Sequence, residues 1–262
     1  MKKYKVALIG YGFLSDIIAK AITEGPLNEF ELVGVLGRTE EKVKDFAATY
    51  DCEPCNEIDE LMALKPNYTI EASTPDGLKQ YAEEILNAQS HLIVLSIGAL
   101  ADEVFYNKIE RIGKENNKKI YLASGAVGGF DVLQTAGLMG KIKARMTSKK
   151  MPRALKKTRD YDPRLQHITE PKEVFLGTTR EIMDFMPNGL NLSIATALAS
   201  AGIDETEMRV IATPNFEGDE YKVEVQLDDE IWIELDVYSK TSAIAGWSVV
   251  TILKNIESTF VI

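Results

Sequence analysis

The sequence predicts an α/β protein with a doubly wound parallel sheet, followed by a second α+β domain that contains a largely antiparallel sheet. Strand and helix patterns alternate over residues 1–123, whereas strand patterns dominate residues 124–238. Strands separated by helices of about 10 to 15 residues are typical of right-handed βαβ units and of a parallel sheet. We therefore expect one domain of residues 1–123 and 239–262 and a second domain of residues 124–238.

The elements of the first half follow from short apolar runs and the charged segments between them. Helical patterns begin near residues 16, 39, 75 and 102, and Thr39 is the expected N-cap of the second helix. The expected strands are 4–9, 30–36, 67–72, 91–95 and 119–122. In such a sheet ligands bind beyond the carboxyl ends of the strands, so functional residues should lie directly after them.

Strand patterns in the second half occur at 141–147, 173–176, 208–212, 221–227 and 231–238, with one helix at 191–201 between the second and the third. The last two strands alternate apolar and polar residues around a turn at 228–230. This alternation predicts an antiparallel hairpin with one solvated face. A final amphipathic helix, at 242–258, is expected to pack back on the first domain.

The composition is that of a globular protein: 45% of the 262 residues are hydrophobic, 27% are charged, and the formal net charge is −10. These values exclude a disordered chain and argue against a nucleic-acid-binding surface over the whole protein. No apolar run approaches the ~18 residues that span a bilayer, and the start of the chain lacks a signal-peptide pattern. We expect a cytoplasmic protein that binds neither nucleic acid nor membrane.

The only cysteines, Cys52 and Cys55, form a CxxC, a spacing found in zinc sites and redox dithiols. A zinc site needs about four ligands, and the two histidines, His91 and His167, have no second CxxC near them. The pair also lies in an expected connector, residues 50–56, rather than at a helix start that would stabilise a thiolate. We expect two reduced thiols and no metal site.

Charge is unevenly distributed along the chain. Residues 141–164 contain ten basic and two acidic residues, a local net charge of +8, so the rest of the chain carries −18. A cationic segment can attract an anionic substrate or a cofactor phosphate. The alternative, which we prefer for most of these side chains except Lys149 and Lys150, is a solvated loop that pairs with the acidic hairpin at 217–236.

The strongest local signal is GYGFLS at residues 10–15, between the first strand and the first helix. Gly10 allows a tight turn, and Gly12 lets the backbone approach a pyrophosphate at the helix N-terminus, as in the Rossmann dinucleotide-binding motif. Ser15 stands where that motif has its third glycine. A tight structural turn is the alternative. The expected cofactor contacts here are Gly10, Gly12, Phe13 and Leu14.

The residue after the second strand bears on the choice between NAD and NADP. NAD-specific sites carry an acid there, whereas an arginine accommodates a 2′-phosphate. This chain has Arg38 in the run LGRT and lacks the acid, so we expect NADP, with NAD as the other candidate. The alternative is a solvated arginine that stacks on adenine without discriminating between the two.

Polar residues also follow the third and fourth expected strands. Ser73, Thr74 and Pro75 come after one, and Ser96 and Gly98 come after the other. Both groups lie where a doubly wound sheet lines a dinucleotide site, and we include all five residues among the expected cofactor contacts. Each group could equally be an ordinary strand-to-helix turn, with proline at the helix start.

Five segments together resemble the L-aspartate dehydrogenase family, in the same order and over nearly the whole chain. They are EASTPDGLKQY, SIGALADEVF, SGAVGGFD, MPNGLNLSIATALA and SKTSAIAGWSVVTILKNIES. The resemblance implies a Rossmann domain, an α/β substrate domain and a C-terminal helix that returns to the first domain. It also implies reversible NAD(P)-dependent oxidative deamination of L-aspartate to iminosuccinate.

Two further cofactor contacts are carried over from the resemblance. Ala126 matches a position that contacts the nicotinamide end of the cofactor in the family, and Asn191 matches the second nicotinamide-binding residue. The alternatives are a small residue in a tight turn for Ala126 and a helix N-cap for Asn191, and this second role is compatible with cofactor binding.

The sequence departs from the family at its catalytic histidine, which lies in an Asn-x-His motif of a strand after a proline-containing loop. When the chain is aligned through Ala212, Thr213 and Pro214, the three residues at the motif are Asp219, Glu220 and Tyr221. Tyr221 is therefore the candidate acid/base, although it could equally be a core or interface aromatic. Its pKa near 10 would need lowering, for which Lys150 and Lys240 are the candidate neighbours.

The sequence thus favours an NAD(P)-dependent oxidoreductase that acts on the CH–NH₂ group of a small amino acid, with hydride transfer between the nicotinamide and the α-carbon. One alternative is an imine or carbonyl reductase with a different substrate, and another is an NADP-binding protein without turnover. We expect a small anionic amino or imino acid as substrate. A homodimer is expected through the exposed edge of the second sheet, in the substrate domain.

Overall fold

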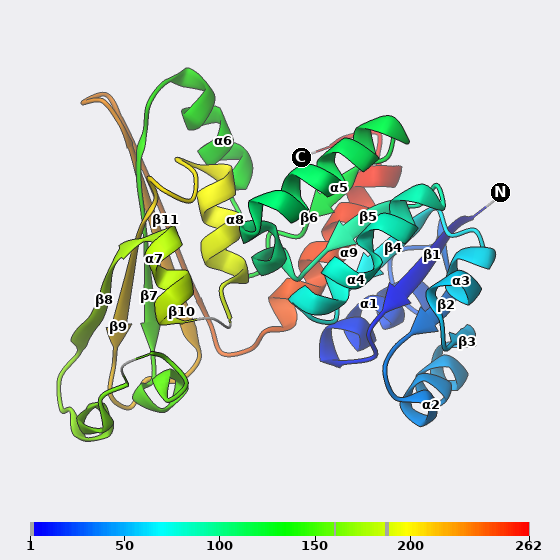
Figure 1. Ribbon diagram of the computed structural model, residues 1–262, viewed down its shortest axis with the longest axis horizontal. Coiled ribbons are helices and arrows are strands. Elements are labelled where there is room, and N and C mark those ends of the chain that lie inside the picture. Colours follow the sequence, from blue (N-terminus) through cyan, green and yellow to red (C-terminus); the bar gives the residue numbers. More distant parts are fainter. Residues whose placement is uncertain (1–2, 160, 187–188, 262) are drawn as a thin grey trace. The chain divides into compact units, whose positions relative to one another are not determined.

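The computed structural model describes residues 3–159, 161–186 and 189–261. The chain divides into two units, one formed by Met1–Gly125 with Ala243–Ile262 and the other by Ala126–Ser242. Each unit has its own sheet, and Figure 1 labels the strands and helices of both.

The first unit contains the predicted parallel sheet. Its strands are β1 (Tyr4–Ile9), β2 (Phe30–Leu36), β3 (Glu53–Cys55), β4 (Tyr68–Glu71), β5 (His91–Val94) and β6 (Ile120–Leu122). Its helices are α1 (Phe13–Thr23), α2 (Glu40–Tyr50), α3 (Ile58–Ala63), α4 (Pro75–Asn87), η1 (Ile97–Ala101, a 3₁₀ helix), α5 (Glu103–Glu115) and α9 (Ala243–Glu257). The strand order is β3-β2-β1-β4-β5-β6, and the strand pairings in the described residues are parallel. This is the doubly wound order, whose switch point lies between β1 and β4, so the predicted fold class is confirmed.

The core of the first unit forms around β1. Val6 and Leu8 are 0% exposed, because helices cover both faces of a parallel sheet. Helix α9 belongs to the same core, where Val249 is also fully buried. Gly246 of α9 lies so close to α1 that a Cβ atom there would stand 3.1 Å from the Ile17 side chain. The C-terminal helix is therefore an integral part of this unit.

The prediction of a connector at residues 50–56 is wrong in part, because Glu53–Cys55 forms the edge strand β3. Helix α3 was not predicted either. A capping box between Glu57 and Glu60 begins this helix of 6 residues. Both elements are too short for hydrophobic periodicity to reveal them.

The second unit contains a mixed sheet. Its strands are β7 (Lys143–Lys150), β8 (Lys172–Thr178), β9 (Glu207–Ala212), β10 (Asp219–Leu227) and β11 (Ile231–Ser239). Its helices are α6 (Phe130–Met139), α7 (Thr179–Phe185), α8 (Asn191–Ala199) and the 3₁₀ helices η2 (Pro152–Leu155) and η3 (Pro163–His167). In the order β11-β10-β7-β9-β8, only the β7–β9 pairing of the described strands is parallel. The predicted largely antiparallel sheet is confirmed.

Strands β10 and β11 form the predicted hairpin. Val223 lies opposite Leu235, and Val225 lies opposite Ile233. Both valines are 0% exposed, whereas Trp232 on the other face is 59% exposed. The alternation in the sequence thus corresponds to one buried and one solvated face.

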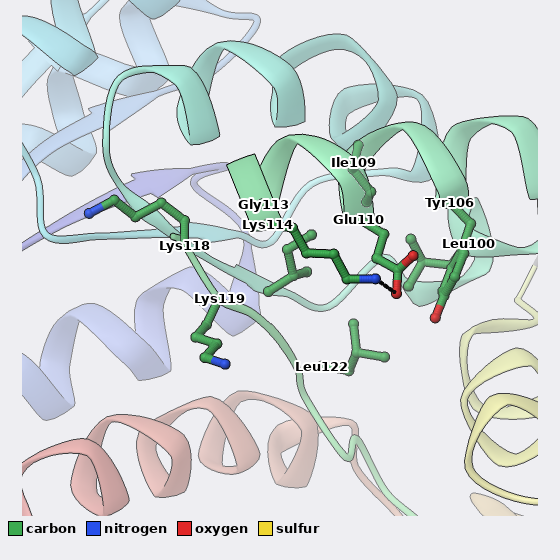
Figure 2. A pocket seen from close by; sticks show the side chains of 10 residues that line it. Leu100, Tyr106, Ile109, Glu110, Gly113, Lys114, Lys118, Lys119 and Leu122 are labelled. Atoms are coloured by element: carbon green, nitrogen blue, oxygen red, sulfur yellow. Dashed lines mark ion pairs between the residues drawn. The ribbon is translucent and has the colours of Figure 1, made fainter. Parts of the chain in front are cut away.

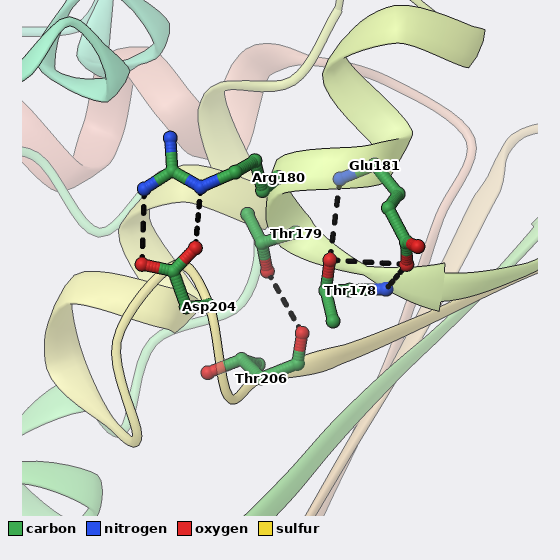
Figure 3. Close-up of polar contacts among 6 residues, drawn as sticks. All are labelled: Thr178, Thr179, Arg180, Glu181, Asp204 and Thr206. Atoms are coloured by element: carbon green, nitrogen blue, oxygen red, sulfur yellow. Dashed lines mark hydrogen bonds and ion pairs between the residues drawn. The ribbon is translucent and has the colours of Figure 1, made fainter.

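The prediction of a single helix between β8 and β9 is wrong, because α7 precedes α8. Figure 3 shows the start of α7, where Thr178 and Glu181 form a capping box. The backbone N–H of Thr178 donates to the Glu181 carboxylate at 2.6 Å, and Arg180 pairs with Asp204. Local polar contacts therefore stabilise this short helix, which has no extended apolar pattern in the sequence.

The basic segment is partly a strand rather than a loop. Strand β7 continues to Lys150, three residues beyond the predicted end at 147. Lys149 pairs with Glu220, and Lys150 lies 3.5 Å from Asp219, both acids on β10. The two lysines that we expected to be exceptions to pairing with the acidic hairpin are therefore paired with it.

His91 lies at the amino end of β5. Its ring stacks on Tyr68 with 5.2 Å between centroids, and its Nδ1 accepts a hydrogen bond from the backbone N–H of Lys119 at 2.9 Å. Burial and the charges of Lys118 and Lys119 lower the pKa of His91 below its ordinary value. Protonation of Nδ1 would bring two donors together, so the folded state favours the neutral ring.

We predict that His91 lowers the free energy of unfolding as the pH falls below its ordinary pKa of 6.5. The unfolded chain takes up the proton first in this range, so stability is lost as the pH decreases. In H91Q the amide oxygen can accept the same N–H, and this pH dependence should disappear. Urea unfolding at about pH 7.5 and about pH 5.5 measures it. H167Q, at an exposed histidine, is the control, and an unchanged pH dependence in H91Q would contradict the assignment.

Candidate functional site

The glycine-rich turn after β1 brings β1 and β4 together. Gly10 has a φ of +109°, and a Cβ atom there would stand 2.5 Å from the carbonyl oxygen of Ala72. Its N–H donates to the carbonyl of Leu36 at 2.8 Å. Only glycine tolerates both this φ and this approach, so the turn needs Gly10 even without a ligand.

Gly12 has a different role. It is the N-cap of α1, it makes no side-chain cap, and nothing lies within 4 Å of its Cβ position. Phe13 is 57% exposed, and Leu14 is half-buried. A helix N-terminus without a side-chain cap offers its N–H groups to an anion. The open space at Gly12, which a side chain would fill, therefore fits the pyrophosphate of a dinucleotide.

The Ser15 hydroxyl, in the first turn of α1, lies beside the glycine-rich turn. It is 0% exposed, 3.4 Å from the Cβ position of Gly10, and has no hydrogen-bond partner among the described residues. Buried hydroxyls without a partner are uncommon. A serine thus fits at the position of the third glycine and leaves one unsatisfied polar atom beside the turn.

Arg38 lies two residues after the end of β2, the strand that neighbours β1. It is exposed, and the described part of the chain gives it no ion-pair or hydrogen-bond partner. Glu40, the next acid along the chain, pairs with Lys44 at 2.6 Å. A free positive charge, rather than a carboxylate, is therefore available at this strand end.

Tyr11 lies over the same strand end. Its hydroxyl donates to Oγ1 of Thr39 at 3.0 Å, and its ring packs so closely on Gly37 that a Cβ atom there would stand 2.4 Å from it. This ring links the glycine-rich turn to the residues around Arg38. The sequence did not indicate this contact, which depends on the glycine at position 37.

The residues after β4 have two kinds of partner. Thr74 is the N-cap of α4, where its Oγ1 accepts from the N–H of Gly77 at 3.1 Å, and Pro75 is the first helical residue. These are the local roles that stood as the alternative to cofactor binding. Ser73 instead donates its hydroxyl to the carboxylate of Glu71 at 2.8 Å.

The residues after β5 contact the same carboxylate. The Ser96 hydroxyl is buried and donates to Glu71 at 2.9 Å, and Gly98 lies half-buried in η1. The two serines meet because β4 and β5 are adjacent parallel strands. Glu71 was not predicted as a site residue, although a carboxylate at the end of an apolar strand is a signal that could have found it.

The remaining expected cofactor contacts belong to the second unit. Ala126 is half-buried in the turn before α6, in which Gly128 and Gly129 have φ values of +72° and +65°. Asn191 is the first residue of α8, and Leu190 is the N-cap. The N-cap that stood as the alternative role for Asn191 is therefore Leu190, one residue earlier.

Lys150, Asp219 and Tyr221 form a polar cluster at one end of the second sheet. The ammonium of Lys150 lies 3.5 Å from Oδ1 of Asp219 and 5.4 Å from the centroid of the Tyr221 ring. Asp219 occupies the position aligned with the family's asparagine and was not predicted as a site residue. The cluster thus joins a cation, a carboxylate and a phenol.

Lys150 and Lys240 do not lower the pKa of Tyr221, as an acid/base role of this residue by itself would require. Burial, the charge of Asp219 and a hydrogen bond to that carboxylate raise the pKa of Tyr221 instead. Lys150 lies over the ring face, and Lys240 pairs with Glu217 at 3.6 Å. Tyr221 therefore keeps its proton and acts as a hydrogen-bond donor at neutral pH.

The two cysteines are free thiols. Burial raises the pKa of Cys52 to about 12 and that of Cys55 to about 11, so thiolates are scarce at neutral pH. The described residues contain no group of three or more histidine, cysteine or carboxylate side chains that could hold a metal ion.

None of the helices in the described ranges is both long enough and apolar enough to cross a membrane.

A surface hollow of the first unit lies beside the edge strand β6. Figure 2 shows Tyr106 and Ile109 of α5 and Leu122 of β6 around it, with an ion pair of 2.9 Å between Glu110 and Lys114. The predicted cofactor contacts do not line this hollow. The glycine-rich turn and the ends of β2, β4 and β5 therefore remain the candidate dinucleotide site.

Comparison with known proteins agrees with this geometry. Residues 10–123 match the family model for the NAD-binding domain of homoserine dehydrogenase, and residues 131–256 match that for the C-terminal region of aspartate dehydrogenase. The L-aspartate dehydrogenase of Methanococcus maripaludis is 28% identical over 261 residues, 97% of each chain. That of Methanosarcina barkeri is 27% identical over 267 residues, again 97% of each chain.

The fold has a close solved counterpart. The crystal structure of aspartate dehydrogenase from Thermotoga maritima superposes with a TM-score of 0.77, at 22% identity and 99% coverage of both chains. Matches to both domains, in the same order and over nearly the full length, identify the chain as a member of the L-aspartate dehydrogenase family of nicotinamide-dependent oxidoreductases.

Proposed function

We propose that this enzyme prefers NADP(H) and interconverts a small amino acid and its imino acid, with L-aspartate, the substrate named in its relatives, as the first candidate. Family membership supports the reaction on an amino group. The free charge of Arg38 at the end of β2 is the observation that supports NADP, because it can pair with a 2′-phosphate.

The first unit supplies the binding and orientation of the dinucleotide. The N–H groups at the start of α1, beside the open space at Gly12, would hold the pyrophosphate, and Arg38 would hold the adenosine end. A bound nicotinamide would supply the hydride chemistry at the substrate α-carbon. The protein contributes position and charge to that transfer.

The polar cluster of the second unit supports the proton and carboxylate chemistry. The ammonium of Lys150 can pair with a substrate carboxylate. Tyr221, with its raised pKa, donates a hydrogen bond to the carboxylate of Asp219, which would act as the general base. This pair would replace the acid/base role of the family's histidine.

Two further proposals concern the oligomeric state and the cellular location of the enzyme. The edge strand β11 carries Trp232 and Tyr238, which are 59% and 50% exposed, and this supports a homodimer through the second sheet. The free thiols Cys52 and Cys55 support a reducing, cytoplasmic location.

The function predicts that the wild-type protein reduces NADP⁺ with L-aspartate and oxidises NADPH with oxaloacetate plus ammonia, measured by absorbance. Y221F should lower kcat by about 100-fold, because it removes the hydroxyl of the acid/base pair. Y238F, at an exposed tyrosine of β11, is the matched control and should retain kcat. Turnover of another amino acid but not aspartate would contradict the assignment of L-aspartate as the substrate. Full activity in Y221F would contradict the role of Tyr221.

The assignment of Arg38 predicts that R38A weakens NADPH binding by about tenfold and changes NADH binding little. K44A removes a nearby positive charge that is already paired with Glu40, and it should bind both cofactors like the wild type. Titration of protein fluorescence gives the six dissociation constants, for two cofactors and three proteins. Equal losses for NADPH and NADH in R38A would exclude contact with the 2′-phosphate.

The two glycines of the turn should separate stability from binding. G12A places its methyl group in open space, so we expect an unchanged melting temperature but at least about tenfold weaker NADPH binding. G10A meets the carbonyl of Ala72 and should lose more than about 2 kcal/mol of stability. Thermal melts and NADPH titrations measure both, and wild-type affinity in G12A would place the pyrophosphate elsewhere.

A further inference from the structure

Glu71 is a fully buried carboxylate that the proposed reaction does not use. It ends β4, is 0% exposed, and has no ion-pair partner among the described residues. A buried charge is costly unless hydrogen bonds compensate for it, so a carboxylate kept at such a place needs an explanation.

Among the described residues, two serines donate four hydrogen bonds to this carboxylate. Oε1 accepts from the N–H of Ser73 at 2.8 Å, from its hydroxyl at 2.8 Å and from the hydroxyl of Ser96 at 2.9 Å. Oε2 accepts from the N–H of Ser96 at 3.0 Å. Burial raises the pKa of Glu71, and these bonds act in the opposite direction. Both oxygens therefore face donors, as an ionised carboxylate requires.

The bonds connect two separate loops. Ser73 begins the loop from β4 into α4, and Ser96 precedes η1 after β5. Each loop is held by one backbone N–H, so Glu71 fixes the position of the main chain as well as that of the hydroxyls. A backbone hydrogen bond from Leu95 to Glu71 already joins the strand ends, and the Glu71 side chain links the two loops that follow them.

The strand order assigns these loops to one half of the dinucleotide site. In a doubly wound sheet, the half with β1, β2 and β3 holds one mononucleotide, and the half with β4, β5 and β6 holds the other. Arg38 lies at the end of β2, on the side of the adenosine phosphate. Glu71 lies on the other side, with the nicotinamide half.

We propose that Glu71 is a positioning residue for the nicotinamide half of the cofactor: it holds the loops after β4 and β5 at the spacing that this half needs. The inference rests on the proposed dinucleotide site. It assigns to Glu71 no contact with the cofactor, because the serines and their backbone lie between.

The chain offers a matched control on the same two strands. Thr69 and Ser90 share a buried hydrogen bond of 2.9 Å, and both are 0% exposed. Thr69 lies two residues before Glu71 on β4, and Ser90 precedes β5, toward the amino ends of the strands. S90A therefore removes a buried hydrogen bond between β4 and β5 at the end away from the cofactor.

The test compares a whole cofactor with its adenosine half. Dissociation constants of NADPH and of 2′,5′-ADP are measured by calorimetry for the wild type, E71Q and S90A. In E71Q the amide NH₂ must face a serine N–H, so at least one loop loses its anchor. We expect E71Q to bind NADPH about tenfold more weakly and 2′,5′-ADP within about twofold of the wild type. S90A should bind both ligands like the wild type.

The outcomes separate the inference from the proposed function. Wild-type NADPH affinity in E71Q, or equal losses for both ligands, would overturn the role of Glu71. If E71Q does not fold, S96A, which keeps both backbone donors, should show a smaller loss of NADPH affinity with unchanged 2′,5′-ADP binding. If the wild type binds NADH and not NADPH, the NADP preference fails, and the same comparison with NADH and ADP still decides the role of Glu71.

Discussion

The contact between the backbone of Gly10 and the carbonyl of Ala72 is the constraint on which the rest of the first unit depends. It fixes the carboxyl ends of β1 and β4 against each other at the switch point of the sheet, where the crevice of a doubly wound fold opens. A side chain at Gly10 would separate these ends by collision with main-chain atoms that cannot move aside. Helix α1 begins shortly after this contact, at Phe13, with the open space at Gly12 at its N-terminus.

Charged groups of opposite sign lie at different strand ends of the first unit. At the end of β2 a free arginine is available, and at the ends of β4 and β5 a buried carboxylate organises the loops. In the second unit, Lys150, Asp219 and Tyr221 form a cluster in which the raised pKa of Tyr221 keeps the phenol protonated. The net charge of −10 therefore conceals local sites suited to an anionic cofactor and an anionic substrate.

The sequence predicted the elements with strong periodicity and missed those stabilised by contacts distant in the chain. Strands β1, β2, β4, β5 and β6 of the first unit, the hairpin of β10 and β11, and the turn at Gly10 follow from apolar runs and glycine spacing. Short elements such as β3 and α7 depend on sheet edges and capping boxes. The pKa of Tyr221 is raised by burial and by the neighbouring Asp219. The role of Glu71 depends on its hydrogen bonds to Ser73 and Ser96, which follow two different strands. Those properties depend on contacts in the folded structure that the sequence pattern does not reveal.

The central claim is that the start of α1 holds the pyrophosphate of a phosphorylated dinucleotide and that Arg38 holds its 2′-phosphate. A crystal structure of the protein with NADP⁺ tests it most directly. The account predicts density for the pyrophosphate within hydrogen-bond distance of the N–H groups after Gly12, and for the 2′-phosphate against the Arg38 guanidinium. Density for the cofactor elsewhere, such as in the hollow beside β6, or a 2′-phosphate without a contact to Arg38, would contradict it.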